Sequence, residues 1–394
     1  MRHALAGIRV IAIEQAVAAP LCTRHLADLG ADVIKVERPQ HGDFARDYDD
    51  FVRGHSSHFV WLNRGKRSIA LDLKSPDGRR VLLALLRTAD VLVCNLAPGA
   101  LERIVADAEL GELNPRLVRC YLSGYGAQGP YANRKAYDLL VQGEVGTIAV
   151  TGTPHQRAKP GVSLADLSAG TYALAAINAA LLERSRTGRG QRLDISLFEV
   201  LLEWMSPSLL TRKYTGRTPE PAGLGHLSIV PYGPYFTGDG HEILLAVQTD
   251  GQWRRLCASV LKDTALLADS ALSTNAGRLR NRARVEAAVQ EPLSAMPLAL
   301  VTERLEAADV PHARLNQVID VVDHPQAVEA GRWSPTTLSD GQEVEVVTSP
   351  FHTAPDPPGT TRVPGLGEHT DEVLREVGLE TDALGKQVPA NQAS

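Results

Sequence analysis

The stretch GIRVIAIEQAVAAPLCTRHLADLGADVIKVE, residues 7–37, decides the fold of this chain of 394 residues. Its two ends, residues 7–14 and 31–37, are short apolar runs rich in β-branched residues, a pattern typical of buried strands. Residues 19–29, between them, have helical character. Strand, helix and strand in this order predict a parallel pair joined by a helical crossover.

The same alternation continues along the next part of the chain. Further strands are expected at residues 67–73, 90–95 and 117–124. Helices are expected at residues 75–89, with Ser75 as N-cap, and at residues 168–188, closed by Gly188. The pattern predicts an α/β fold whose mostly parallel sheet is covered on both faces, with ligands at the carboxyl ends of the strands.

The remaining sequence indicates a second, smaller domain. A proline- and glycine-rich crossover leads to one strand and several helices, and the tail has strand-then-helix character that returns to the first domain. The expected organisation is a large domain at residues 1–205, a linker at 206–235, a small α+β domain at 236–325 and a return segment at 326–394.

Composition excludes several classes of protein. The chain has 44% hydrophobic and 22% charged residues and a net charge of -5, without the basic excess of a nucleic-acid binder. Its four cysteines lack CxxC or CxxH spacing, so we expect neither a metal site nor a disulfide framework, and a reducing cytoplasm fits best.

The N-terminal residues 1–20 resemble a signal peptide in their early arginine, apolar run and small residues. Charged and polar residues interrupt that run at Arg9, Glu14 and Gln15, so we interpret it as the first strand. No apolar run of about eighteen residues or more follows, and we expect no membrane-spanning segment.

Familiar catalytic motifs are mostly lacking. GYGAQG, residues 124–129, matches GxGxxG, but Pro130 follows at once and no helix opens there, so a tight turn is favoured over a dinucleotide site. The sequence contains no GxSxG, HExxH or GxxxxGK[ST] motif.

One carboxylate stands among small and apolar neighbours in GVSLADLSAG, residues 161–170. By residue type alone, Asp166 is an N-cap candidate for the helix that follows. The unpaired amides of a helix N-terminus would also keep a carboxylate ionised, and an ionised carboxylate can attack an acyl carbon without a general base. Both interpretations stay open on these grounds.

Several blocks resemble one known family in order and content. They are ADVIKVERPQHGD (31–43), LNRGKRSIALDLK (62–74), VCNLAPGALER (93–103), KAYDLLVQGEVG (135–146), LADLSAGTYALAAINAALLERSRTGRGQRLDISLFE (164–199) and PGLGEHTDEVL (364–374). Over nearly the whole chain they are similar to the class III CoA-transferases of the CaiB/BaiF type, which include formyl-CoA transferase, carnitine CoA-transferases and alpha-methylacyl-CoA racemases.

The resemblance implies a Rossmann-like large domain built from both chain ends, a smaller domain, and a homodimer of interlocked rings. It implies that Asp166 attacks an acyl-CoA thioester, giving an aspartyl anhydride and then an aspartyl-CoA thioester. The implied substrates are acyl-CoA and a small carboxylic acid, with no tightly bound cofactor and no nucleic-acid or membrane partner.

The resemblance also assigns binding residues by position. Those matching CoA contacts are Val17, Ala18, Arg38, Leu71, Lys74, Asn95, Leu96, Ala100, Arg103 and Lys135. Gly223, Gly225 and His226 match a mobile glycine loop over the active site, although this loop is shorter than in formyl-CoA transferase.

Two positions bear on the reaction and its substrate. Racemases of the family carry a histidine where this chain has Tyr137, before Asp138, and a phenol with a pKa of about 10 is a poor base, so transfer is favoured over racemisation. Asp138 either positions substrate or holds a turn. Val17 replaces the active-site glutamine of formyl-CoA transferase, which argues against formyl–oxalate exchange and weakly favours larger acyl groups or dicarboxylates. A catalytically silent CoA-binding protein is a further alternative.

Overall fold

The computed structural model describes residues 4–351 and 361–380, which divide into two compact units. Unit 1 comprises residues 1–146, 160–207 and 328–394, and unit 2 comprises residues 147–159 and 208–327. Chain segments far apart in sequence therefore build unit 1.

Unit 1 is organised around a six-stranded, fully parallel sheet of order β3-β2-β1-β4-β5-β8. The strands are β1 (Arg9–Ile13), β2 (Asp32–Glu37), β3 (Arg67–Ala70), β4 (Val91–Cys94), β5 (Val118–Ser123) and β8 (Arg192–Ser196). The order reverses between β1 and β4, as in doubly wound sheets. The predicted α/β class with a large parallel sheet is confirmed, although the strand expected at 67–73 ends at Ala70.

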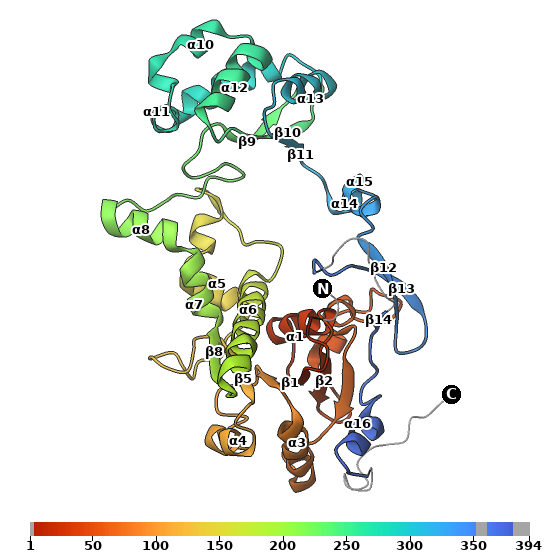
Figure 1. The fold of residues 1–394 in the computed structure, drawn as a ribbon. Helices are drawn as coiled ribbons and strands as arrows, with labels where there is room; N and C mark the ends of the chain where they lie inside the picture. The colour runs from red at the N-terminus through yellow and green to blue at the C-terminus, as the bar shows by residue number, and fades with distance from the viewer. Residues whose placement is uncertain (1–3, 352–360, 381–394) are drawn as a thin grey trace. The chain divides into compact units, whose positions relative to one another are not determined.

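Helices cover both faces of this sheet (Figure 1). One face carries α1 (Ala18–Asp28) and α6 (Leu164–Thr187), which pack against each other. On the other, α3 (Pro76–Thr88), α4 (Asp107–Leu113) and α16 (Thr370–Glu376) share an apolar core with alternate strand residues such as Ile11 and Ile13. Also in unit 1 are α2 (Ser57–Asn63), α5 (Asp138–Val145) and α7 (Leu197–Trp204).

The helix α6 is long and apolar enough to cross a membrane by length and composition. In unit 1 it packs closely against α1: a side chain at Gly170 would meet the Ala18 carbonyl oxygen at 2.5 Å, so only glycine permits this approach. The predicted glycine closure is confirmed, because Gly188 adopts the left-handed C-cap conformation with φ of 73°.

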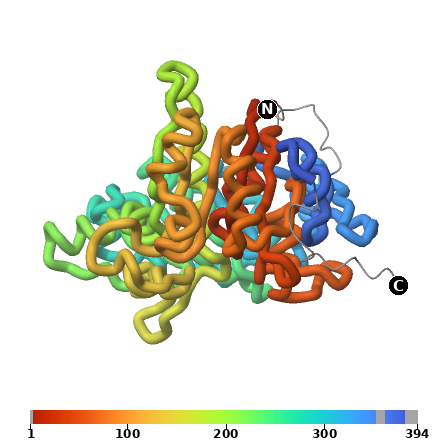
Figure 2. The backbone as a smooth tube through the Cα atoms, turned by 90° about the horizontal axis from the view of Figure 1, so that it is seen from below, coloured from red at the N-terminus to blue at the C-terminus, as the bar shows by residue number. Residues whose placement is uncertain are grey.

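The C-terminal part of unit 1 returns to the first strands. β12 (Trp333–Thr337), β13 (Glu343–Val347) and β14 (Thr361–Arg362) form a small sheet, and Figure 2 shows the C-terminal segment, in blue, beside the red N-terminal one. Arg67 binds Glu376 of α16 at 2.6 Å, and His369 donates its amide to Ser68. The strand and helix expected in this tail correspond to β13, which ends at Val347, and to α16.

Unit 2 combines a small antiparallel sheet with helices. Its sheet has the order β11-β10-β9, with β9 (Tyr232–Phe236), β10 (Glu242–Ala246) and β11 (His312–Arg314). A core around Trp253 joins it to the helices α9 (Asp250–Arg255), α12 (Arg282–Leu293) and α13 (Leu298–Ala307). Shorter elements are the pair β6–β7 (Gly152–Thr153 and Gln156–Arg157), α10 (Thr264–Ala268), α11 (Asn275–Arg280) and α14 (Val318–Val322), while α8 (Ser206–Thr215) and α15 (Pro325–Val328) cross the unit boundaries.

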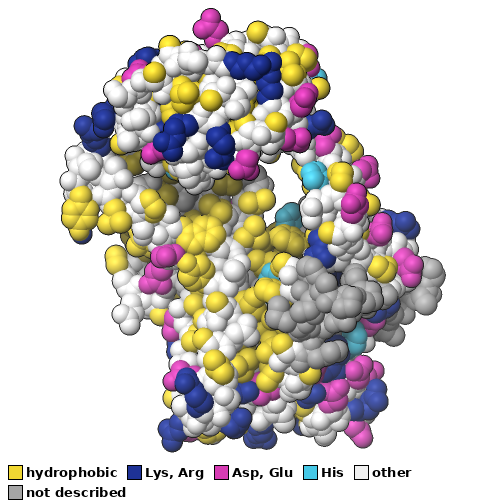
Figure 3. All heavy atoms as spheres, turned by 45° about the horizontal axis from the view of Figure 1, so that its top comes forward, with side chains coloured by type: hydrophobic (Ala, Val, Ile, Leu, Met, Phe, Trp, Pro, Cys, Tyr) yellow, Lys and Arg dark blue, Asp and Glu magenta, His cyan; other side chains and the backbone are white. Residues whose placement is uncertain are grey.

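Surface charge follows the composition. Figure 3 shows basic and acidic side chains interspersed over the visible face, in keeping with 41 Lys and Arg against 46 Asp and Glu. The four cysteines are all buried and free, and within residues 4–351 and 361–380 no cluster of His, Cys, Asp and Glu could hold a metal ion. The cytoplasmic location stays a prediction.

Candidate active site

A cavity of about 1260 Å³ opens in unit 1 where the parallel strands end. Ile13 and Glu37, the last residues of β1 and β2, line it, as does Leu96, just beyond β4. β1 and β4 are neighbours in the sheet without being consecutive, so the cavity lies at the switch point where doubly wound sheets bind ligands.

Six of the ten residues expected to contact CoA line this cavity. Three are apolar or small, namely Leu71, Leu96 and Ala100, and three are cations, namely Arg38, Lys74 and Arg103. The three cations are exposed and form no ion pair within the described residues. Uncompensated cations beside an apolar wall suit a ligand with phosphates and an aromatic base.

The other four expected residues do not line the cavity. Val17 and Ala18 are buried at the start of α1, and Lys135 is exposed before α5. Asn95 instead holds the turn after β1, because its side-chain oxygen accepts from the Gln15 amide at 3.0 Å and its Nδ2 donates to the Gln15 carbonyl at 2.8 Å.

Among the lining residues that the sequence analysis did not name as site candidates are Gln15, His41 and Arg79. Gln15 was noted only as an interruption of an apolar run. Its place directly after β1, a strand at the switch point, is the feature of the sequence that could have identified it as a site residue. Arg79 is paired with Glu109 at 2.6 Å and is thus less available to a ligand than the three free cations.

Asp166 lies in the first turn of α6, beside Asp138 at the start of α5. The N-cap of α6 is Ser163, so the interpretation of Asp166 as N-cap is wrong. Asp138 instead caps amides in the first turn of α6, because its Oδ1 accepts from the amides of Ala165 at 2.7 Å and Asp166 at 3.3 Å. This leaves the Asp166 carboxylate free of capping, and no cation among the described residues pairs with either acid.

The environment of Asp166 favours its protonated form. Burial and then the negative charge of Asp138 raise the pKa of Asp166 to about 7. The expectation that the helix N-terminus keeps it fully ionised is therefore wrong, because desolvation and the second carboxylate outweigh the helix amides. Near neutrality Asp166 exchanges between a protonated and an ionised form.

Two tyrosines lie near this acid. Burial and the charges of Asp43 and Asp166 raise the pKa of Tyr48 to about 12, with Tyr137 a smaller contributor. Tyr137, the N-cap of α5, has 66% of its surface exposed. The phenol at Tyr48 thus stays protonated near neutrality and can donate a hydrogen bond to a ligand.

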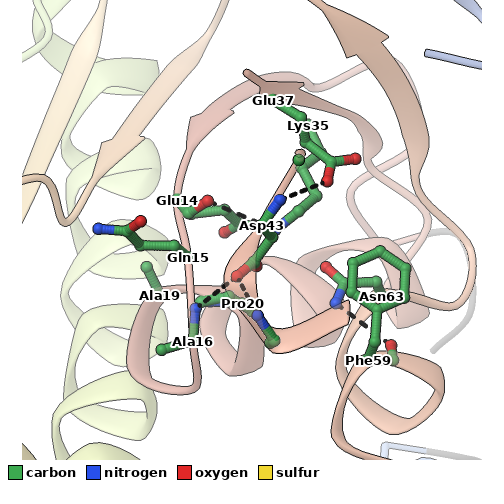
Figure 4. A network of polar contacts seen from close by, with 12 residues as sticks. Glu14, Gln15, Ala16, Ala19, Pro20, Lys35, Glu37, Asp43, Phe59 and Asn63 are labelled. Carbon is green, nitrogen blue, oxygen red and sulfur yellow. Dashed lines mark hydrogen bonds and ion pairs between the residues drawn. The ribbon is translucent and has the colours of Figure 1, made fainter. Parts of the chain in front are cut away.

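A buried ionic network lies beneath the turn that follows β1 (Figure 4). Lys35 Nζ donates to Asp43 Oδ2 at 2.8 Å and approaches Glu14 Oε1 at 3.4 Å, while Lys66 Nζ donates to Glu14 Oε1 at 2.7 Å. The side chains of all four residues are fully buried or nearly so. Two buried cations therefore compensate two buried anions.

This charge balance controls protonation in the network. Burial alone would raise the pKa of Glu14, but Lys66 and Lys35 bring it below its ordinary value. Burial lowers the pKa of Lys66 to about 8 despite Glu14. For the adjacent Glu37, the bonds from Arg46 and the charge of Lys35 overcome burial and lower the pKa to about 2.

The expected glycine loop belongs to unit 2. Gly223 donates its amide to Gly152, and Gly225 to Ala222 at 2.9 Å. The His226 ring contacts Tyr232 with centroids 5.1 Å apart. The mobility of this glycine loop and its part in the active site stay predictions.

The parallel sheet and the cavity at its switch point define a doubly wound α/β protein with a cavity where such folds bind ligands. Residues 5–370 match the family model of CoA-transferase family III, and the chain belongs to this family. The predicted family and the predicted class of enzyme are confirmed.

Known relatives are similar to this chain over most of its length. It is 37% identical over 388 residues to the succinate–glutarate CoA-transferase of Agrobacterium fabrum, with 96% of each covered. It is 34% identical over 323 residues to the acetyl-CoA:oxalate CoA-transferase of Acetobacter aceti, covering 81% of this chain and 82% of that one. A solved CaiB/BaiF family protein from Brucella suis is similar with a TM-score of 0.79 and 31% identity, covering 96% of this chain and 100% of that one.

Proposed function

We propose that this CoA-transferase moves CoA from an acyl-CoA donor to a dicarboxylic acid through covalent intermediates on Asp166. The observation that carries the proposal is the Asp166 carboxylate in the first turn of α6, uncapped and without a cation, with its pKa raised to about 7. A desolvated, basic carboxylate is a strong oxygen nucleophile in its ionised form.

The proposed exchange conserves the thioester through four displacements. Ionised Asp166 attacks the acyl carbon and the carbon–sulfur bond breaks, giving a mixed anhydride and CoA thiolate. The thiolate attacks the Asp166 carbonyl carbon and releases the donor acid, leaving an aspartyl-CoA thioester. The acceptor carboxylate and then the thiolate repeat these steps in reverse, which regenerates Asp166 without net proton transfer.

The cavity supports CoA as the carried group. Arg38, Lys74 and Arg103 would neutralise its phosphates, and Leu71 and Leu96 offer an apolar surface for adenine. Dicarboxylate acceptors are proposed because both relatives are named for dicarboxylates. Racemisation is the weaker alternative, since Tyr137 stands where a racemase needs a base.

We also propose that the chain forms a homodimer, with the interlocked rings implied by the family resemblance. Large apolar side chains stay exposed on α14, where Val318 is 86% and Ile319 is 72% accessible, and on α8, where Tyr214 is 76% accessible. Light scattering of the purified chain tests this, and a monomer mass at micromolar concentration contradicts it.

Trapping the intermediate tests the mechanism. The protein is incubated with succinyl-CoA, or with other acyl-CoA donors, then treated with hydroxylamine and digested. We expect a hydroxamate on the peptide that contains Asp166 and none in Asp166→Asn. Its absence across a broad donor panel, with CoA still bound, favours the catalytically silent alternative.

A further inference from the structure

Gln15 occupies the turn between β1 and α1, at the switch point itself. It lines the cavity together with the cations Arg38 and Lys74. Two residues further on, Val17 packs in one apolar cluster with Leu167, the neighbour of Asp166. Gln15 therefore lies between the cationic part of the cavity and the first turn of α6.

The backbone of this turn is fixed from two sides. Asn95, just after β4, binds both the amide and the carbonyl of Gln15. The next residue, Ala16, has φ of 65°, a left-handed conformation that costs free energy for a residue with a Cβ. Asp43 Oδ1 accepts from the Ala16 amide at 3.0 Å and stabilises this conformation.

The buried network in turn holds Asp43 in place. Lys35 binds the other oxygen of Asp43, and Lys66 and Glu14 complete the ionic cluster. Figure 4 shows Glu14, Lys35 and Asp43 of this cluster on one side of the turn, with the Gln15 side chain directed away from them, on the side of α6. The fold thus orients this side chain through an arrangement that includes an unfavourable backbone conformation.

The Gln15 carboxamide differs from the two others nearby. The side chain of Asn63 accepts from Lys66 at 3.0 Å and donates to the Phe59 carbonyl, and that of Asn95 accepts from and donates to the Gln15 backbone. Within the described residues, the Gln15 side chain has no hydrogen-bond partner. Its donor and its acceptor are both available to a ligand.

We propose that Gln15 positions the pantetheine arm of CoA by hydrogen bonding to one of its amide groups. This inference rests on the proposed function. A carboxamide and an amide each have a donor and an acceptor, so they pair without a buried charge. The location between the phosphate-binding cations and Asp166 is where the arm must pass for its thioester to reach the nucleophile.

The test compares CoA with adenosine 3′,5′-bisphosphate, which lacks the arm, by calorimetric titration of the full-length protein. For Gln15→Leu we expect a CoA affinity about three- to tenfold weaker and an unchanged bisphosphate affinity. Arg103→Ala should weaken both ligands. The control Gln191→Leu, at the opposite end of the sheet before β8, should change neither.

The outcomes separate the two proposals. Equal CoA affinity of wild type and Gln15→Leu overturns the assignment of Gln15, and so does an equal loss for both ligands, which indicates a purely structural role. Failure of the wild type to bind CoA overturns the proposed function instead. Gln15→Met, closer in length to glutamine, is the second variant should the leucine form not fold.

Discussion

Unit 1 contains two groups of acids, one fully buried and one partly buried, and they differ in whether nearby cations compensate their negative charges. Glu14 and Asp43 are matched by Lys35 and Lys66, and the pKa of Glu14 is lowered. Asp166 has only another acid, Asp138, beside it, and its pKa is raised to about 7. A carboxylate is thus a structural anchor in one place and, in the proposed mechanism, the nucleophile in the other.

The difference follows from what each group must do. A compensated acid holds a fixed proton state, so it can orient a turn but cannot easily attack a substrate. An uncompensated acid makes the ligand-free protein less stable, and that cost is typical of functional sites. Variants that alter the compensation should therefore affect stability in the network and activity at Asp166.

The largest expected effect is on activity. Asp166→Asn removes the nucleophilic oxygen anion while keeping size, so CoA transfer should fall by a factor on the order of 10⁴ or more. Turnover with an acyl-CoA and a paired dicarboxylate is the measurement. Asp194→Asn, which changes an exposed acid paired with Arg192, is the matched control and should keep activity. Turnover near the wild-type level in Asp166→Asn would refute the mechanism.

The second effect concerns the network. Lys35→Met leaves Glu14 and Asp43 buried with only Lys66 between them, so the free energy of unfolding should fall by about 3–5 kcal/mol. Urea unfolding at neutral pH measures it. Arg284→Met breaks the pair between the exposed Arg284 of α12 and Asp269 and should cost only about 0.5 kcal/mol. Equal losses in the two variants contradict the role given to burial.

Local signals in the sequence were sufficient for much of the fold. Ser75 was predicted as N-cap, and its side chain accepts from the Gly78 amide at 2.9 Å. β1 and β2 were expected from apolar runs, and both form in the central sheet. These features, namely helix caps, glycine helix ends and buried strands, depend on residues a few positions apart. A single sequence is therefore enough to predict them.

The sequence did not allow us to predict which buried carboxylates would be paired with cations. Glu14 is paired with Lys66 across 52 positions, and Asp138 caps a turn 27 positions away. Such pairs exist only once the chain is folded, and the degree of burial decides the sign of each pKa shift. This is why Asp166 was expected to be ionised, and why Gln15 was not recognised as a cavity residue.

A smaller effect is expected on stability at high pH. The pKa of Asp166 is about 7 in the folded protein against a reference value of 3.8, so the native state binds more protons than the unfolded state between these values. Stability from this group is therefore present below pH 4 and is lost as pH rises through 7. Asp166→Asn should be about 1–3 kcal/mol more stable than wild type at pH 8, a range reduced because the side chain is partly exposed.

Urea unfolding of the two proteins from pH 4 to pH 8 measures this difference. All other titrating groups are shared, so subtraction isolates Asp166 together with its charge interaction with Asp138. The gap should close toward pH 4. A gap that is constant across the range, or one that favours the wild type at pH 8, contradicts an uncompensated acid at this position.

The smallest effect concerns the pH dependence of the rate. Because Asp166 must be ionised to act as the proposed nucleophile, kcat/KM should rise with pH through an apparent pKa of about 7. Asp138→Asn removes the neighbouring charge while an amide oxygen can still accept from the Ala165 amide, so the rise should move to lower pH. The move should be partial, because burial contributes more than Asp138 to the raised pKa. Glu144→Gln, an exposed change further along α5, should leave the profile in place. A shift of the Asp138→Asn profile to higher pH would mean that this acid assists Asp166 by some means other than its charge, and the contrast between the two groups of acids would then fail at its reactive member.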